Sequence, residues 1–338
     1  MMTPFQDSFG RSVTYLRVSV TDRCDMRCVY CMSENMEFLP KAEILSFEEL
    51  ERICAAFIRS GVTRLRVTGG EPLVRRDIGS FFSALGKYIH KPGEGGHLEE
   101  LTLTTNGSRL SLHADMLRRA GVRRVNVSLD SLDFERFSRI TRRGRLDQTL
   151  EGIRAARNAG LAVRINTVAM AGVNDDEFDA LLSWCGEIGA DLCLIETMPM
   201  GETGEDRTDR YLPLSTVRAD LARRWTLEPL SLRTGGPARY MRVAETGRLL
   251  GLITPMTHNF CESCNRVRLS CTGQFYTCLG HEGATDLRRP VRDGVDDAEL
   301  LTLVHDAIGR KPKGHDFVIG RRPDDPAAIR RHMSVTGG

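Results

Sequence analysis

The sequence predicts an α/β protein whose parallel strands form an open barrel, followed by a smaller α+β region. Two observations predict this class: strand and helix patterns alternate over the first two-thirds of the chain, and the strand patterns are apolar on one face only. The 338 residues carry 47 Lys and Arg against 45 Asp and Glu, and 41% are hydrophobic. These values are typical of a soluble globular protein and exclude a disordered chain or a disulfide-rich miniprotein.

Six β units follow one another in the first part of the chain. The first helix pattern opens with a Ser46-x-x-Glu49 capping box. The strand patterns cover Tyr15–Val20, Arg64–Val67, Leu101–Thr104, Arg124–Leu129, Ala162–Val168 and Leu192–Thr197. The helix patterns cover Ser46–Arg59, Asp77–Tyr88, Ala114–Ala120, Leu146–Asn158 and Asp175–Ile188. Helical connections of this length imply parallel strands, which wind into an open sheet or a barrel.

A change of composition divides the chain into two predicted domains. Residues 201–214 are charged and nearly free of apolar side chains, which predicts a linker. The partial barrel would occupy residues 1–200, and the smaller α+β domain residues 215–338. In the second domain the strand patterns are shorter, and a helix pattern near Ala298–Ile308 closes it.

The polar face of the predicted strands carries arginines. Arg17, Arg66 and Arg164 lie on this face. Parallel sheets are normally buried on both faces, so one explanation is a sheet with a solvated face, as antiparallel sheets often have. The helical connections favour the other explanation, a barrel with a polar lumen. Because the guanidinium fork fits phosphate and carboxylate groups, we expect a phosphorylated ligand there.

Three of the ten cysteines follow the first predicted strand as Cys24-x3-Cys28-x2-Cys31. This is the loop position that a parallel barrel uses for chemistry. Three thiolates on a [4Fe–4S] cluster leave one iron open to a small molecule. Zinc is the alternative, but zinc sites usually combine two C-x2-C pairs, and no fourth Cys or His follows nearby.

A second group, Cys261, Cys264 and Cys278, lies in the C-terminal region. Cys271 stands between its members, so a four-cysteine zinc site is an open alternative. Arg266 and Arg268 share one face of a short strand pattern between these cysteines. They suit phosphate beside a metal cluster, or alternatively form an exposed basic strand edge.

The first cysteine motif resembles that of the radical S-adenosylmethionine (SAM) enzymes. Their C-x3-C-x2-C signature, with an aromatic residue before the last Cys, is matched here together with Tyr30. The turn Gly69-Gly70-Glu71-Pro72 is similar to the family's methionine-binding motif. The resemblance implies that SAM binds the open iron and is cleaved to methionine and a 5′-deoxyadenosyl radical.

Within this superfamily, the chain resembles the GTP 3′,8-cyclase family of molybdenum cofactor biosynthesis. The most specific matches are Thr21–Met32, Cys264–Ser270 and the final Gly337-Gly338, and the resemblance covers essentially the whole length. It implies an incomplete (α/β)6 TIM-like barrel, closed on its open side by the C-terminal domain, with two [4Fe–4S] clusters. It also implies conversion of GTP to 3′,8-cyclo-7,8-dihydro-GTP, in which the radical removes the ribose 3′ hydrogen and C3′ attacks guanine C8.

The resemblance also implies a role for individual residues. The ligands of the two clusters would be Cys24, Cys28 and Cys31, and Cys261, Cys264 and Cys278. SAM would be held by Tyr30, Gly69, Gly70, Glu71, Ser128 and Met198. GTP would contact Arg17, Arg66, Thr104, Arg164, Arg266, Val267 and Arg268, and the catalytic set would be Arg17, Arg266, Arg268, Gly337 and Gly338. Arg164 departs from the family, which commonly has Lys there. The two glycines would otherwise be read as a frayed terminus.

The expected partners are GTP, a downstream cyclic pyranopterin monophosphate synthase and an electron donor such as flavodoxin or ferredoxin, and a homodimer is compatible with them. Without a signal pattern or an apolar stretch of membrane length, we expect a cytoplasmic protein. A radical SAM enzyme that modifies a peptide is one alternative, which the arginine-lined lumen disfavours. A non-catalytic RNA-binding metal protein is another, disfavoured by the near-neutral charge and the 6% of aromatic residues.

Overall fold

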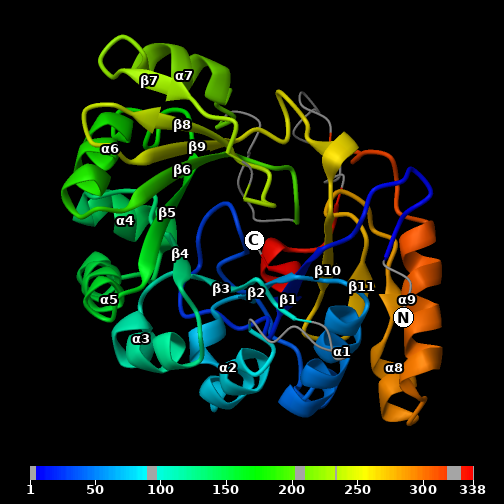
Figure 1. The fold of residues 1–338 in the computed structure, drawn as a ribbon. Helices are drawn as coiled ribbons and strands as arrows, with labels where there is room; N and C mark the ends of the chain where they lie inside the picture. Colours follow the sequence, from blue (N-terminus) through cyan, green and yellow to red (C-terminus); the bar gives the residue numbers. More distant parts are fainter. Residues whose placement is uncertain (1–4, 90–96, 202–209, 233, 318–328, 338) are drawn as a thin grey trace.

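The computed structural model describes residues 5–89, 97–201, 210–232, 234–317 and 329–337. In this part of the chain one twelve-stranded sheet runs in the order β12-β11-β10-β1-β2-β3-β4-β5-β6-β9-β8-β7. The sheet curves into an open ring with helices on its outside (Figure 1). None of the described helices is long and apolar enough to span a bilayer.

The first six strands are parallel and lie side by side in chain order. They are β1 (Tyr15–Ser19), β2 (Arg64–Thr68), β3 (Glu100–Thr105), β4 (Arg124–Ser128), β5 (Ala162–Ala169) and β6 (Asp191–Glu196). The predicted alternation is present in each strand. In β1, Leu16 and Val18 are fully buried in the apolar core under the helices, whereas Arg17 lies on the opposite, inner face.

The C-terminal strands extend this sheet at both edges. Strand β10 (Arg266–Leu269) pairs parallel with β1, and β9 (Leu249–Ile253) pairs parallel with β6. The remaining strands are antiparallel additions: β11 (Gln274–Tyr276), β12 (Thr285–Asp286), β8 (Arg239–Val243) and β7 (Leu227–Pro229). Because β9 and β10 are not paired in the described sheet, the ring stays open, and the predicted incomplete barrel is confirmed.

The predicted helical connections are present, with shifted ends. They are α1 (Phe47–Arg59), α2 (Ile78–Gly86), α3 (Leu110–Arg119), α5 (Leu146–Asn158) and α6 (Phe178–Glu187). A further helix, α7 (Leu214–Leu221), was not predicted and begins at the end of the predicted linker. Both hydrogen bonds of the capping box before α1 form: Ser46 N donates to Glu49 Oε2 (2.6 Å), and Glu49 N donates to Ser46 Oγ (3.1 Å). Part of the predicted linker, residues 202–209, lies outside the described residues.

Several short helices were not predicted. Helix α4 (Phe134–Thr141) has only two turns, too few for a periodic pattern, and it begins after Asp133, whose carboxylate accepts a hydrogen bond from Arg136 N (2.7 Å). In the C-terminal region α8 (Arg288–Arg292) and α10 (Met333–Thr336), which ends the described chain, were not predicted either. Helix α9 (Asp297–Gly309) is the one predicted near Ala298–Ile308, and with α8 it covers the far edge of the sheet. Figure 1 shows α10 inside the ring of strands rather than on its surface.

Candidate active site

The two cysteine groups lie at opposite ends of the β1–β10 strand pair. Cys24, Cys28 and Cys31 follow the carboxyl end of β1, whereas Cys261 and Cys264 precede the amino end of β10. Because β1 and β10 are parallel, these ends are separated by the length of the strands. Five residues of strand span about 16 Å. The site is therefore a lumen with one cysteine triad at each end.

The first triad lies on a loop that α4 holds in place. Arg27 N and Val29 N donate to the carbonyl oxygens of Thr141 (2.9 Å) and Ile140 (3.0 Å) at the end of α4. Cys24 Sγ accepts hydrogen bonds from Met26 N (3.4 Å) and from Asn106 Nδ2 (3.7 Å), a residue of the loop after β3. The segments after β1, β3 and β4 thus meet around this triad.

Gly70 lies close to the chain after β1. A Cβ at Gly70 would collide with the backbone of Arg23, and Gly70 N donates to the carbonyl of Thr21 (2.7 Å). The absence of a side chain therefore lets the Gly69-Gly70 turn pack directly beside the first cysteine loop.

Glu71 is fully buried and joins the loops after β2 and β3. Its carboxylate accepts hydrogen bonds from Leu73 N (3.0 Å), Thr105 Oγ1 (2.8 Å) and Asn106 N (2.7 Å). Burial raises the pKa of the Glu71 carboxyl from 4.5 to about 7, against the opposing effect of the backbone donors at Asn106 and Leu73. Because the Glu71 oxygens accept hydrogen bonds from the protein's own donors, Glu71 braces the two loops beside the first cysteine triad.

This raised pKa predicts a pH-dependent stability. The folded chain keeps a proton on Glu71 that the unfolded chain releases above its ordinary pKa of 4.5, so the free energy of unfolding should fall between pH 4.5 and 7. In the cofactor-free Glu71→Gln variant, this fall should be smaller by about 3 kcal/mol. Chemical denaturation at pH 5 and pH 8 measures it, and equal slopes in both proteins would contradict the expectation.

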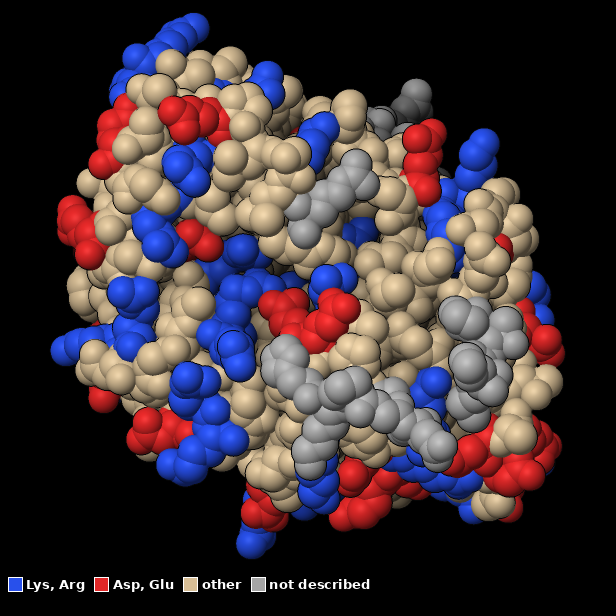
Figure 2. All heavy atoms as spheres, in the orientation of Figure 1, with Lys and Arg blue, Asp and Glu red and all other residues tan. Residues whose placement is uncertain are grey.

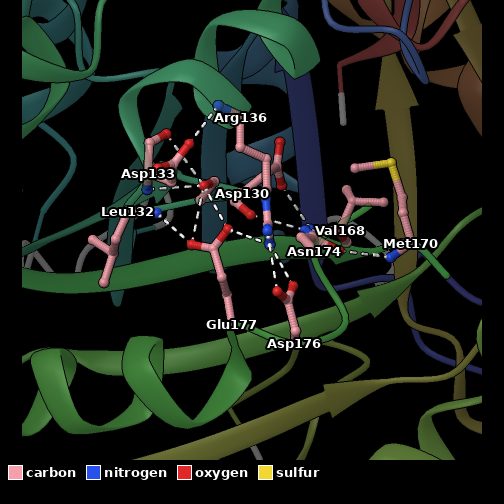
Figure 3. A network of polar contacts seen from close by, with 10 residues as sticks. Asp130, Leu132, Asp133, Arg136, Val168, Met170, Asn174, Asp176 and Glu177 are labelled. Carbon is pink, nitrogen blue, oxygen red and sulfur yellow. Dashed lines mark hydrogen bonds and ion pairs between the residues drawn. The ribbon is translucent and has the colours of Figure 1, made fainter. Parts of the chain in front are cut away.

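A buried polar network fixes Tyr30, the aromatic residue of the cysteine motif. Tyr30 Oη donates to Asp130 Oδ2 (2.7 Å), and Val168 N donates to Asp130 Oδ1 (2.8 Å). Asn174 Nδ2 donates to the carbonyl oxygens of Asp130 (2.8 Å) and Val168 (3.0 Å), while Met170 N donates to Asn174 Oδ1 (2.9 Å). Figure 3 shows Asn174 between the ends of β4 and β5, so the network ties both strand ends to the first cysteine loop.

Glu177 and Arg136 extend this network toward the surface (Figure 3). Glu177 accepts hydrogen bonds from Ser131 Oγ (2.7 Å) and Leu132 N (2.8 Å), and it pairs with Arg136 Nη1 (2.7 Å). Helix α6 starts after Glu177 and not at Asp175 as the apolar pattern predicted. Residues 175–177 instead form the turn that carries this carboxylate to the loop after β4.

Arginines line the inner face between the two triads. Arg17 on β1 lies in register with Arg66 on β2 and with Arg268 on β10. Burial and the nearby charges of Arg268 and Arg66 lower the pKa of Arg17 well below its ordinary value. Burial likewise lowers the pKa of Arg66 and, helped by Arg266 and Arg331, lowers that of Arg268 to about 9.

These arginines have few anionic partners. Among the described residues, no carboxylate pairs with Arg17, Arg66 or Arg268 within 4.0 Å, and the buried Nε atoms of Arg17 and Arg66 have no hydrogen-bond partner. Buried like charges without counter-ions are unfavourable unless an anion binds among them. Figure 2 shows Lys and Arg atoms in the depression at the centre of this face, which is thus suited to a phosphorylated ligand.

The other residues predicted to contact the nucleotide differ in the direction of their side chains. Thr104 and Arg164 lie on the inner face, and the buried Thr104 Oγ1 has no partner among the described residues. Arg164 Nη1 donates to Tyr240 Oη (2.6 Å) on β8, and its guanidinium lies 4.9 Å from the Tyr240 ring centroid. The side chain of Val267 lies in the apolar core and is 1% exposed. Only the backbone of Val267 can therefore contact a ligand in the lumen.

Ser128 and Met198 lie at the carboxyl ends of strands, the same edge of the sheet that carries the first triad. Ser128 ends β4 on its inner face, in register with Asn166 of β5, and Met198 follows β6. Together with Tyr30 and Gly70, they stand at the carboxyl ends of β1, β2, β4 and β6. This is the edge at which a parallel barrel binds its ligands.

The β10–β11 hairpin brings the second triad together and leaves Cys271 out. Strand β11 runs antiparallel to β10, with Tyr276 opposite Arg268, so Cys278 returns to the end where Cys264 lies. Cys271 is fully buried at the other end of the hairpin, where its carbonyl accepts a hydrogen bond from Leu45 N (2.8 Å). The spacing of the four cysteines in the sequence did not reveal this separation.

This position predicts that Cys271 is not an iron ligand. The reconstituted Cys271→Ser variant should keep about eight iron atoms per chain, as two cubanes require. The matched Cys278→Ser variant should fall toward four, because it lacks a proposed ligand. Colorimetric iron determination on both proteins checks this, and a comparable loss in Cys271→Ser would assign that thiol to the cluster.

The C-terminal tail enters the lumen beside the arginines. Arg268 Nη1 donates to the carbonyl of Gly337, which has φ +73°, and a Cβ at Gly337 would collide with the side chain of Thr68 on β2. Arg331 ties the tail to the second triad, since its Nη2 donates to the carbonyl of Cys278 (3.4 Å). The structure thus places Gly337 at the arginine cluster, while Gly338 lies outside the described residues.

The comparisons with known proteins agree along the whole chain. The model of the radical SAM superfamily matches residues 18–185, and that of the molybdenum cofactor synthesis C domain matches residues 190–317. A GTP 3′,8-cyclase of Rhodopseudomonas palustris (strain TIE-1) is 59% identical over 99% of this chain and 96% of its own length. One from Rhizobium meliloti (strain 1021) is 61% identical over 99% of this chain and 95% of its own.

The chain belongs to the GTP 3′,8-cyclase family. It is therefore a radical SAM enzyme, and its cofactors are SAM and [4Fe–4S] clusters. Solved structures support the fold alone. Streptococcus suis SuiB bound to its precursor peptide SuiA has a TM-score of 0.61 at 17% identity, over 94% of this chain and 75% of that chain. SuiB bound to S-adenosylmethionine has a TM-score of 0.60 at 17% identity, over 86% and 68%. The peptide-modifying alternative is not favoured, because the cyclases match at about 60% identity over the full length.

The described residues fit these cofactors. Burial raises the pKa of the Cys24 and Cys28 thiols, so their thiolates need a cationic partner such as cluster iron. No group of three or more described His, Cys, Asp or Glu side chains is arranged around a single metal ion. In a cubane each cysteine binds a different iron, so its ligands need not converge on one point.

Sequence patterns missed several residues of the site. Asn174 and Asn106 act through loop hydrogen bonds that have no periodic signature. Tyr240 on β8 contacts Arg164 on β5 across β6 and β9, a contact between residues 76 positions apart in the chain. Asp130 could have been found, because it follows the polar-face residue Ser128 at the carboxyl end of β4.

Proposed function

We propose that this chain converts GTP to 3′,8-cyclo-7,8-dihydro-GTP, the first step of molybdenum cofactor biosynthesis. The observation that carries the proposal is the arrangement of unpaired arginines between two cysteine triads. The family relationship supports the same reaction, since relatives at about 60% identity are GTP 3′,8-cyclases.

In this proposal the arginines bind and orient the nucleotide. The phosphate oxygens are neutralised by Arg17, Arg66 and Arg268. On the same face Thr104 supplies a hydroxyl group, and Arg164 is held in place by Tyr240. Cys24, Cys28 and Cys31 bind one cluster beside the SAM residues Tyr30, Gly69, Gly70, Ser128 and Met198, and Cys261, Cys264 and Cys278 bind the other. Gly337 enters beside Arg268, where a side chain would collide with Thr68, and Gly338 is proposed to act with it.

The cofactors supply a 5′-deoxyadenosyl radical that removes the ribose 3′ hydrogen. The protein's own part is to hold C3′ and guanine C8 within bonding distance and to exclude water and oxygen from the lumen. Removal of one hydrogen atom, closure of the C3′–C8 bond, and uptake of one electron and one proton give a product isomeric with GTP. Because all of this occurs between the two triads, the arginine-lined lumen has to hold the whole nucleotide.

The electron requirement and the product suggest partners and a compartment. We include in the proposal a low-potential donor such as flavodoxin or ferredoxin, and a downstream cyclic pyranopterin monophosphate synthase that receives the product. The cytoplasm is the proposed compartment, because both cofactors need reducing conditions. A homodimer is compatible with the proposal, and sedimentation velocity of the reconstituted protein tests it.

The test is anaerobic turnover of the reconstituted protein with dithionite, SAM and GTP. We expect 5′-deoxyadenosine and a nucleotide with the mass of GTP but a different retention time, formed in equal amounts. The Cys28→Ala variant serves as the control and should form neither. Cleavage of SAM without consumption of GTP would remove GTP as the substrate and reopen the peptide-modifying alternative.

A further inference from the structure

Lys311 is a buried charge near the second cysteine triad. It follows α9, and its side chain is only 2% exposed. Lysine is almost never fully buried unless it is paired with an anion. In the described part of the chain no carboxylate pairs with it. Its Nζ donates instead to two backbone carbonyl oxygens, those of Arg266 (3.0 Å) and Thr277.

Both carbonyls belong to segments that carry the second triad. Arg266 follows Cys264 by two residues, and Thr277 immediately precedes Cys278. The ammonium group therefore sits where the two segments of the hairpin come together. Carbonyl oxygens satisfy hydrogen-bond donors but leave a full positive charge without a counter-ion.

The backbone around Lys311 is held from the other side by Arg11. Arg11 donates to the carbonyl oxygens of Pro312 (2.6 Å), Lys313 (2.9 Å) and Cys261 (2.7 Å), and it pairs with Asp7 (2.5 Å). Arg11 thus links the segment after α9 to Cys261, the first cysteine of the triad.

The charge of Lys311 lies close to all three cysteines. Its Nζ binds the carbonyl of Arg266, two residues after Cys264, and that of Thr277, next to Cys278. The chain that follows Lys311 is held against Cys261, because Arg11 binds the carbonyl oxygens of both Lys313 and Cys261. One buried cation is therefore placed to favour negative charge at the three sulfurs.

We propose that Lys311 is the counter-ion of the second [4Fe–4S] cluster and holds its reduction potential up. The inference rests on the proposed assignment of Cys261, Cys264 and Cys278 as ligands. A cubane on three thiolates carries net negative charge, which grows by one when it accepts an electron. A fixed buried cation stabilises the reduced form more than the oxidised form, and low local polarizability strengthens this effect.

The experiment is an anaerobic redox titration of the reconstituted full chain with dithionite, followed by electron paramagnetic resonance. The second cluster is identified as the signal that Cys264→Ser removes, which also tests its assignment. Lys311→Met removes the charge and keeps the apolar stem. Lys311→Gln removes the charge but keeps an amide donor for the carbonyls of Arg266 and Thr277. Lys313→Met removes an exposed lysine two residues away as the matched control.

In Lys311→Met and Lys311→Gln, the ratio of reduced to oxidised second cluster at a fixed potential should fall about tenfold or more. Tenfold corresponds to about 59 mV for a one-electron couple. The first cluster, Lys311→Arg and Lys313→Met should keep their potentials. If Lys311→Met does not assemble the cluster, Lys311→Gln decides. A Gln variant with full iron content and an unchanged potential would overturn the proposal and leave Lys311 a purely structural role.

Discussion

Replacing Arg17 with Met is expected to lower kcat/KM for GTP about 10² to 10³-fold while making the ligand-free chain more stable. Arg17 has no anionic partner among the described residues, and Arg66 and Arg268 lie beside it. Loss of one or two charge-assisted hydrogen bonds to phosphate, each of about 1.5–3 kcal/mol, accounts for the kinetic effect. Relief of the repulsion should raise the free energy of unfolding by about 1 kcal/mol.

The opposite signs of these two effects make the measurement specific. Thermal unfolding of the cofactor-free protein and steady-state kinetics of the reconstituted enzyme are compared in the same variant. Arg76→Met is the matched control, because the Arg76 side chain is 95% exposed and its one ion pair among the described residues is with Asp77 at the surface. It should change neither quantity. A destabilised Arg17→Met protein with unchanged GTP kinetics would show that Arg17 is a structural residue.

Replacing Gly337 with Ala is expected to lower turnover about 100-fold with little change in SAM affinity. The backbone at Gly337 has φ +73°, and the added Cβ would collide with Thr68. The tail should therefore leave its place, and Arg268 would lose the carbonyl that orients its guanidinium. A loss of about 100-fold corresponds to about 2.7 kcal/mol of transition-state stabilisation.

Gly294→Ala separates steric collision from backbone strain. Gly294 has φ +80°, but no atom lies within 4 Å of its added Cβ. This variant should lose about 1 kcal/mol of stability through strain alone and retain its turnover. SAM binding by equilibrium dialysis and turnover under saturating GTP measure both variants. Equal turnover in Gly337→Ala and the wild-type enzyme would contradict an active role of the tail.

The inner and outer faces of the strands were predictable because they depend on local alternation. In a strand, adjacent residues such as Leu16 and Arg17 project to opposite faces of the sheet. The full burial of Leu16 and the partial exposure of Arg17 agree with this. The pairing of β10 with β1 was not predictable from local patterns, because it joins segments about 250 residues apart. That pairing is nevertheless what sets Arg268 beside Arg17 and separates the two triads.

The same limit applies to single residues. From their spacing in the sequence, Cys271 and Cys278 are equally good candidates for the third ligand of the second cluster. Only the antiparallel β10–β11 hairpin shows that they lie at opposite ends of the strands. Lys311 stands in a polar segment after α9, where an exposed side chain is the ordinary expectation, yet it is buried. Val267 shows the converse, since adjacent residues of a matched motif face opposite sides of β10. Contacts of this kind arise from long-range packing, on which the period of a segment carries no information.

The most direct test of the central claim follows the ribose hydrogen. The reconstituted enzyme is supplied with reductant, SAM and GTP carrying deuterium at C3′, and 5′-deoxyadenosine is analysed by mass spectrometry. We predict one deuterium per 5′-deoxyadenosine formed, and none when the label is placed at C2′. Formation of unlabelled 5′-deoxyadenosine from 3′-deuterated GTP, at the rate of GTP consumption, would contradict radical cyclisation of GTP in this lumen.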